Sequence, residues 1–188
     1  VAGLQAIATA RRLGAVVTAT DVRAAAGEQV QSLGAKFIMT DALKDASGQR
    51  GYARELTEDE RKAQAALVAE HIAKQDIVIT TALIPGRPAP RLVSADMVKS
   101  MRPGSVIVDL AVERGGNVEG AVAGKIVTTA NDVKIIGHLN VPGRIAASAS
   151  LLYAKNLLAF LETMTDKDAK ALAINEEDEL VAATMLTH

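Results

Sequence analysis

The chain has 188 residues and a formal net charge of −1, from 21 basic and 22 acidic side chains. This length suits one α/β core but not two large domains, and the even spread of charge gives no basic stripe for nucleic acid. The absence of cysteine excludes disulfides and thiolate metal sites. Only 2% of residues are aromatic, so aliphatic side chains must build the core, as in a buried parallel sheet covered by helices.

The first 21 residues resemble the later portion of a dinucleotide-binding βαβ unit. Residues 2–13 show the apolar period of a helix, and a short β-branched run then ends at Asp21. Gly3 stands where the third glycine of G-x-G-x-x-G would sit if Val1 and Ala2 were the two intervening residues. We therefore expect a nucleotide site whose first strand and first glycines are missing from the chain. The alternative is that Gly3 only allows a close helix–strand contact, with no ligand.

Asp21 also indicates which dinucleotide would bind. An acid about 20 residues after the fingerprint hydrogen-bonds the adenosine ribose hydroxyls, and a carboxylate there repels the 2′-phosphate of NADP. Arg23 argues the other way, since an arginine could hold that phosphate. Because Asp21 comes first, at the expected strand end, the pattern favours NAD.

Helices and short strands then alternate along the chain, which predicts a doubly wound, mostly parallel sheet lacking its first strand. The stretch 40–60 has no apolar period and is either a binding loop or lid or a solvated insertion. The predicted helices span 24–33, 57–74 and 94–101, and the predicted strands span 36–39, 76–81, 105–109, 125–128 and 133–136.

The longest predicted helix, 145–162, is apolar around much of its circumference, which is more than one sheet face requires. We expect it to pack on a domain that precedes this chain. The expected organisation is a nucleotide-binding domain at 1–140, a helix returning to the missing domain at 141–165, and a tail or linker at 166–188.

The sequence offers little acid–base chemistry. It has no Ser-His-Asp or Cys-His set and no metal-ligand cluster, and His71 is expected to be a surface or hydrogen-bonded residue. A dehydrogenase must move a proton with its hydride, and none of the three candidates, His138, Asp109 and Glu113, stands out. Direct hydride transfer between two nicotinamides needs only positioning and exclusion of water. The poverty of acid–base groups favours that reaction, with no catalytic side chain and no metal.

Several motifs resemble one family along nearly the whole chain. It is the NAD(H)-binding alpha component of proton-translocating nicotinamide nucleotide transhydrogenase, within the alanine dehydrogenase/transhydrogenase superfamily. The Gly-Tyr-Ala motif distinguishes it from the alanine dehydrogenases. The motifs are Val1-Ala-Gly-Leu-Gln-Ala, Ala-Thr-Asp21-Val-Arg23, Gly51-Tyr-Ala-Arg-Glu-Leu, Ile-Thr-Thr-Ala-Leu-Ile-Pro-Gly-Arg-Pro-Ala-Pro and Asn140-Val-Pro-Gly-Arg.

The resemblance implies a set of cofactor contacts. It places Val1 and Gly3 under the pyrophosphate and a mobile loop over the bound cofactor. The resemblance also aligns Glu113 with an acid that alanine dehydrogenases use near their substrate. In a transhydrogenase it implies that Glu113 transfers no proton. The implied NAD(H)-binding residues are Val1, Gly3, Asp21, Val22, Arg23, Gly51, Tyr52, Gln64 and Leu83.

The resemblance also implies partners. Members of the family form homodimers and pass hydride from NADH to NADP(H) held on a separate component. The transfer is coupled to proton movement through a membrane component, so the expected location is cytoplasmic, peripheral on the inner (plasma) membrane. Two other functions stay open: an alanine-dehydrogenase-like NAD-dependent oxidoreductase, and a non-catalytic module that senses NAD.

Overall fold

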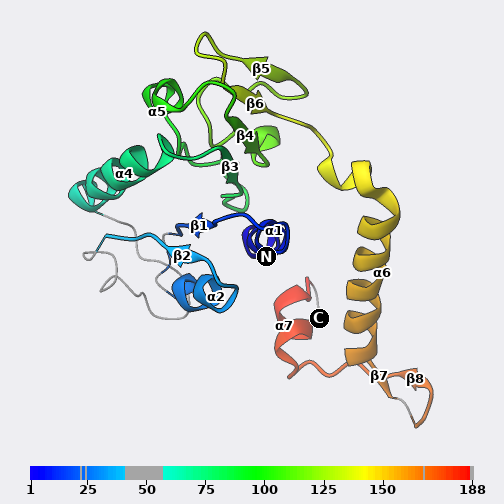
Figure 1. Cartoon of the computed structure of the whole chain (residues 1–188). Helices are drawn as coiled ribbons and strands as arrows, with labels where there is room; N and C mark the ends of the chain where they lie inside the picture. Colours follow the sequence, from blue (N-terminus) through cyan, green and yellow to red (C-terminus); the bar gives the residue numbers. More distant parts are fainter. Residues whose placement is uncertain (22, 24, 41–56, 167, 187–188) are drawn as a thin grey trace. The chain divides into compact units, whose positions relative to one another are not determined.

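The structure is a computed structural model of the chain, and it describes all residues except 22, 24, 41–56, 167 and 187–188. The chain divides into two compact units, Val1–Leu139 and Asn140–His188 (Figure 1). The first unit contains the described residues of the predicted nucleotide site.

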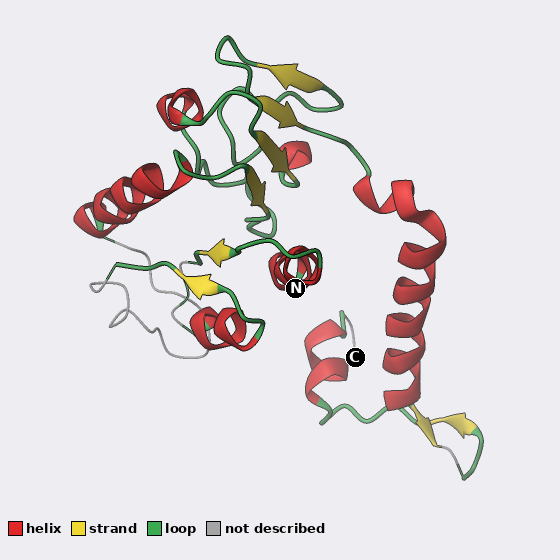
Figure 2. Ribbon diagram, in the orientation of Figure 1, coloured by secondary structure: helices red, strands yellow, loops and turns green. Residues whose placement is uncertain are grey.

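Helices and strands alternate in the first unit, as predicted from the sequence (Figure 2). The strands at its amino-terminal end are shorter than predicted, with two residues each. In chain order the elements are α1 (Ala2–Arg12), β1 (Thr18–Ala19), α2 (Ala26–Ser32), β2 (Lys36–Phe37), α4 (Glu58–Ile72), β3 (Ile77–Thr80), α5 (Ala95–Ser100), β4 (Val106–Asp109), the 3-10 helix η2 (Val112–Arg114), β5 (Ile126–Thr128) and β6 (Lys134–Ile136).

The described strands of this unit form two hydrogen-bonded sheets. One is the parallel pair β1–β2, and the other has the strand order β3–β4–β6–β5. In the second sheet β3, β4 and β6 run parallel, while β5 is an antiparallel edge strand. The register pairs Thr80 with Asp109, so β3 and β4 end side by side. The predicted mostly parallel α/β arrangement is confirmed.

Each sheet has its own apolar core. Ile107 of β4 and Ile135 of β6 are the centre of the larger core and are almost fully buried. The smaller core joins Ile7 of α1 to Val30 of α2 and to partly buried Phe37 of β2. These aliphatic side chains drive the assembly because apolar surface is transferred out of water.

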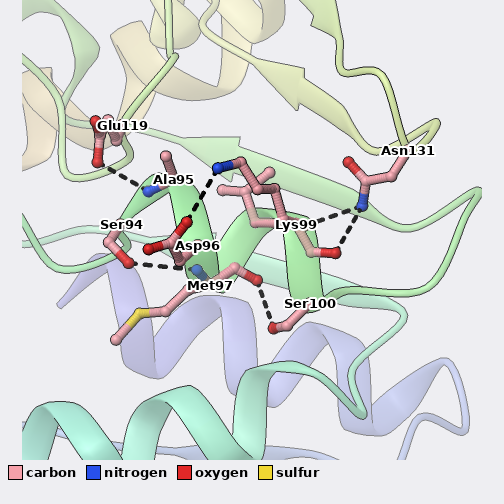
Figure 3. Close-up of polar contacts among 9 residues, drawn as sticks. Ser94, Ala95, Asp96, Met97, Lys99, Ser100, Glu119 and Asn131 are labelled. Carbon is pink, nitrogen blue, oxygen red and sulfur yellow. Dashed lines mark hydrogen bonds and ion pairs between the residues drawn. The ribbon is translucent and has the colours of Figure 1, made fainter.

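Side-chain caps fix the ends of the helices that cover the sheet. The helix predicted from residue 57 begins with a capping box: the Glu60 amide donates to Thr57 Oγ1 at 3.3 Å, and the Thr57 amide donates to Glu60 Oε2 at 2.8 Å. In α5, Glu119 accepts from the Ala95 amide at 2.8 Å (Figure 3). At the other end, Asn131 donates to backbone carbonyls of the last turn.

The second unit comprises η3 (Val141–Ile145), α6 (Ala146–Thr163), β7 (Thr165–Asp166), β8 (Ala171–Leu172) and α7 (Glu179–Thr184). The segment predicted as a tail thus contains an antiparallel strand pair and a helix capped by Asp178. α6 has no buried residue, and Leu152 is 64% exposed. That α6 packs on a further domain stays a prediction. Among the described residues, none of the helices combines the length and the hydropathy that a membrane crossing requires.

Candidate cofactor-binding site

The amino-terminal turn of α1 lies against the end of β3. Val1 is the N-cap residue of α1 and is fully exposed. Thr81 is the residue directly after β3. A Cβ atom added to Gly3 would lie 3.4 Å from Thr81 Oγ1. This is an ordinary van der Waals distance, so α1 contacts the end of β3, but the contact by itself does not require glycine at position 3. Whether Gly3 lies under a pyrophosphate stays a prediction.

The backbone amides of this turn can serve a ligand, because the first amides of any helix lack intrahelical acceptors. The first turn of α1 contains no acidic residue. Such a helix terminus suits an anionic group, because its amides and its dipole both favour negative charge.

Asp21 follows β1 and is bound on both carboxylate oxygens by Arg23. The Arg23 guanidinium donates from Nε to Oδ1 and from NH2 to Oδ2, each at 3.0 Å. The Arg23 backbone amide also donates to Oδ1 at 2.8 Å. A carboxylate oxygen has two acceptor positions, and the described residues fill one of those on Oδ2. The Asp21 side chain is 30% exposed, which leaves it within reach of a ligand.

This pairing sets the charge of both groups. Burial acts to raise the pKa of Asp21, but the hydrogen bonds and the charge of Arg23 outweigh it and lower that pKa. The pKa of Arg23 is raised by its hydrogen bond to Asp21. Asp21 is therefore ionised at neutral pH, and its carboxylate accepts from two nitrogens of the Arg23 guanidinium.

Gln64 of α4 joins the ends of β1 and β2. Its Nε2 donates to Thr20 Oγ1 at 2.8 Å, and its Oε1 accepts from the Thr40 amide at 3.3 Å. Thr20 immediately precedes Asp21, so this bridge fixes the backbone on which the acid stands. Sequence reasoning assigned Gln64 to the cofactor shell by resemblance and did not reveal the bridge.

Leu83 begins the exposed portion of the loop that leaves β3, and its side chain is 55% exposed. Asn117, which is fully buried, holds this loop at its base. The Ala82 amide donates to Asn117 Oδ1 at 3.0 Å, and Asn117 Nδ2 donates to the carbonyls of Ala82 at 2.9 Å and Pro90 at 2.8 Å. No local pattern indicates this role, because the partners lie 27 to 35 residues from Asn117.

Asp109, a candidate proton carrier from the sequence, is a structural residue instead. It is 1% exposed and accepts hydrogen bonds from the amides of Ala111 at 2.9 Å and Val118 at 3.0 Å. Gly116 approaches this carboxylate closely, because a Cβ there would lie 2.7 Å from Asp109 Oδ2. Burial leaves Asp109 no access to a substrate.

The structure gives the other candidates different settings, or does not describe them. His71 is hydrogen-bonded to Thr18 Oγ1 at 2.8 Å, as expected for a satisfied histidine. Glu113 lies exposed on η2, and His138 is partly buried after β6. The described residues contain no group of three or more possible metal ligands. Val22, Gly51 and Tyr52 lie outside the described residues.

Helices beside a mixed, mainly parallel sheet, with polar groups at the strand ends, define a Rossmann-like α/β domain. Comparison with known proteins places the chain within this class. The family model described as Alanine dehydrogenase/PNT, C-terminal domain, matches residues 1–188. The chain belongs to this family, and the resemblance found in its motifs is confirmed.

Individual relatives agree with this assignment. A protein from Rhodospirillum rubrum, named as an NAD(P) transhydrogenase subunit alpha, is 60% identical over 189 residues, covering 100% of this chain and 49% of that protein. The crystal structure of transhydrogenase from Sinorhizobium meliloti matches with a TM-score of 0.78 and 68% identity, over 100% of this chain and 48% of that one. An L-alanine dehydrogenase matches with a TM-score of 0.58 and 27% identity, over 93% of this chain and 47% of that one. The chain spans about half the length of these relatives.

Proposed function

We propose that this chain is the NAD(H)-binding portion of a nicotinamide nucleotide transhydrogenase alpha subunit. The observation that carries the proposal is the ionised, partly exposed Asp21 at the end of β1, where the described residues fill one of the two acceptor positions on Oδ2. A ribose hydroxyl donating to that oxygen would make a charge-assisted hydrogen bond. The names of the relatives from Rhodospirillum rubrum and Sinorhizobium meliloti support the same function.

The described residues fit the two polar moieties of a dinucleotide. The first turn of α1, which carries no acidic residue and contacts the end of β3 through Gly3, suits the pyrophosphate. Asp21 suits the adenosine ribose, and its negative charge repels a 2′-phosphate. Arg23 directs Nε and NH2 of its guanidinium at Asp21, so the two charges form one pair there. We therefore propose NAD(H) rather than NADP(H) for this chain.

NAD(H), when bound, supplies or accepts the hydride. The chain's own residues bind and orient it: Gln64 fixes the strand ends beside Asp21, and Leu83 offers apolar surface at the end of β3. Val22, Gly51 and Tyr52 complete the proposed shell by resemblance to the family. Asp109 is buried and hydrogen-bonded, and we assign no catalytic side chain in this chain. Direct transfer between nicotinamides fits this arrangement, since it requires positioning rather than proton transfer.

The whole reaction requires more than this chain. We propose that NADP(H) is bound by a partner component, that the chain acts as a homodimer, and that hydride transfer is coupled to proton movement through a membrane component. The complex would lie on the cytoplasmic face of the inner (plasma) membrane. The support is the subunit naming of the relatives, of which this chain covers about half.

The test is hydride exchange in a reconstituted system. The purified protein is mixed with an NADP-binding partner component, NADH and an NADP analogue whose reduction can be followed by absorbance. We expect reduction that requires both proteins. Alanine-dependent reduction of NAD by the protein alone would instead identify the alanine-dehydrogenase-like alternative, and NADH binding with no exchange would identify a sensor.

A further inference from the structure

One buried amide closes the loop that leaves β3. Asn117 is 0% exposed, and its side chain uses one acceptor and two donor contacts. These contacts reach Ala82 and Pro90, at the two ends of the loop. A single side chain therefore holds both ends at a fixed separation.

The backbone around Asn117 closes the loop further. The amides of Leu92 and Val93 donate to the Asn117 carbonyl at 2.8 and 3.0 Å, and the Ala89 amide donates to the Arg114 carbonyl at 2.8 Å. Prolines at 85, 88 and 90 restrict the intervening backbone. Between these fixed ends the loop exposes apolar side chains: Leu83 is 55% exposed and Ile84 is 44% exposed.

This loop starts beside the helix terminus that suits the pyrophosphate. Ala82 follows Thr81, whose Oγ1 would lie 3.4 Å from a Cβ on Gly3. Any shift of Ala82 would change the distance between Leu83 and the first turn of α1. We infer that Asn117 is a positioning residue for the dinucleotide: it holds loop 82–90 preformed at the distance from α1 that the bound cofactor requires. This inference rests on the proposed NAD(H) function.

The chemistry at position 117 requires an amide. An aspartate of the same shape could still accept from the Ala82 amide, but its second oxygen would face the carbonyls of Ala82 and Pro90. The carboxylate oxygen and the two carbonyl oxygens are all acceptors, so they repel one another. Protonation of the carboxyl gives it one donor and relieves part of this repulsion. Burial and the two carbonyls would both favour the protonated form of this carboxyl. An Asn117→Asp variant should therefore hold the loop better at acidic pH than at alkaline pH.

The first test uses the unmodified protein. Hydrogen–deuterium exchange of the amides of Ala82 and Ala89 is measured with and without saturating NADH. A preformed loop predicts slow exchange in both states, with less than about a twofold difference. If these amides exchange freely without NADH and become protected only with it, the cofactor orders the loop, and the inference is overturned.

The second test compares Asn117→Asp with Asn131→Asp. Asn131 is a matched control, because its amide also donates to backbone carbonyls, at the end of α5 rather than at the loop. We expect Asn117→Asp to weaken NADH binding, measured by calorimetry, on the order of tenfold at pH 8. Some of the loss should be recovered at pH 6, while Asn131→Asp should stay within about twofold at both values.

The outcomes separate this inference from the proposed function. If Asn117→Asp keeps full affinity at pH 8 while Asp21→Asn loses affinity, NAD(H) binding stands and the positioning role of Asn117 is wrong. If the unmodified protein binds no NADH, the proposed function fails and the inference fails with it. If Asn117→Asp does not fold, hydrogen–deuterium exchange at the Ala82 amide of the unmodified protein still decides whether the loop is preformed or is ordered by NADH.

Discussion

The two groups of strand ends in the first unit are held in different ways. At β3 and β4, Asp109 and Asn117 are almost completely buried and bind backbone groups. At β1 and β2, the contacts are made by side chains that water reaches: Arg23 is 55% exposed and Asp21 is 30% exposed. Buried polar contacts are costly to break, whereas exposed ones exchange readily with solvent or a ligand.

This contrast suggests that the two ends serve different purposes. The β3–β4 end provides a rigid frame, in which removing one polar group leaves its partners unsatisfied. The β1–β2 end provides groups that can rearrange, at small cost in stability, when a ligand arrives. Variants at the two ends should therefore separate into those that unfold the protein and those that change only binding.

The largest expected effect is on stability at Asp109. Asp109→Ala leaves the buried amides of Ala111 and Val118 without their acceptor, and we expect a loss of roughly 2–5 kcal/mol. Asp21→Ala removes an exposed ion pair and should cost less than about 1 kcal/mol. Urea denaturation of both variants measures the difference, and equal losses would remove the distinction between the two ends.

A smaller loss is expected at Gly116. This residue has φ +79°, and a Cβ there would lie 2.7 Å from Asp109 Oδ2. Gly116→Ala should cost about 2–3 kcal/mol, from backbone strain and overpacking together. The control is Gly104→Ala: its φ is +84° with nothing within 4 Å of the added Cβ, so it should lose only about 1 kcal/mol. Thermal unfolding that ranks the two variants equally would show that the contact with Asp109 is unimportant.

The Gln64 bridge should matter more for binding than for stability. Gln64→Leu removes the hydrogen bonds to Thr20 and Thr40 and should cost about 1 kcal/mol of folding free energy. NADH affinity should fall as well, since Thr20 precedes Asp21. Gln64→Glu keeps two acceptor oxygens for Thr20 and Thr40 and should retain most of the stability. A Gln64→Leu protein with unchanged affinity would show that the bridge does not position the acid.

The smallest expected effect is a pH dependence at His71. Burial lowers the pKa of His71, helped by the charges of Lys74 and Lys36. Because this pKa is lowered, the folded state favours the neutral ring. The resulting stabilisation is fully present above about pH 6.5, the pKa of histidine in the unfolded chain. This stabilisation is lost as the pH falls through the pKa of His71 in the folded state. The free energy of unfolding should thus fall on acidification from pH 7.5 to 5, by well under about 1 kcal/mol, because solvent screens the partly exposed ring.

Thr18→Val is the control for this prediction. It removes the hydrogen-bond partner of His71 and leaves the ring in place. His71→Gln should abolish the pH-dependent contribution, while Thr18→Val should reduce stability at every pH. A pH profile that is identical in His71→Gln and the unmodified protein would assign the effect to another group.

Local patterns in the sequence predicted much of this architecture. The apolar period located α1, the predicted helix from residue 57 matches the start of α4, and aliphatic runs located β3, β4 and β6. These features depend on neighbours within a few residues, so a sequence displays them directly. The strands β1 and β2 are shorter than predicted: the flanking residues Val17 and Ile38 still make one backbone hydrogen bond each across the pair, but the paired register covers only two residues of each strand.

The long-range contacts could not be predicted in the same way. Asp109 was a candidate acid by its place at a strand end, but its burial depends on how residues 111–118 fold back over it. Asn117 meets Ala82 and Pro90 only because β3 and β4 pair in one register. Asp21 was identified by spacing alone, and its role in binding NAD(H) stays a prediction.

The central claim is that Asp21 binds the adenosine ribose of NAD(H). Calorimetry of NADH binding to the unmodified protein and to Asp21→Asn, at one pH and salt concentration, tests it most directly. Loss of the charge-assisted hydrogen bond should weaken binding by about 1–3 kcal/mol, with no comparable loss of folding stability. An Asp21→Asn protein that binds NADH as tightly as the unmodified protein would contradict the claim.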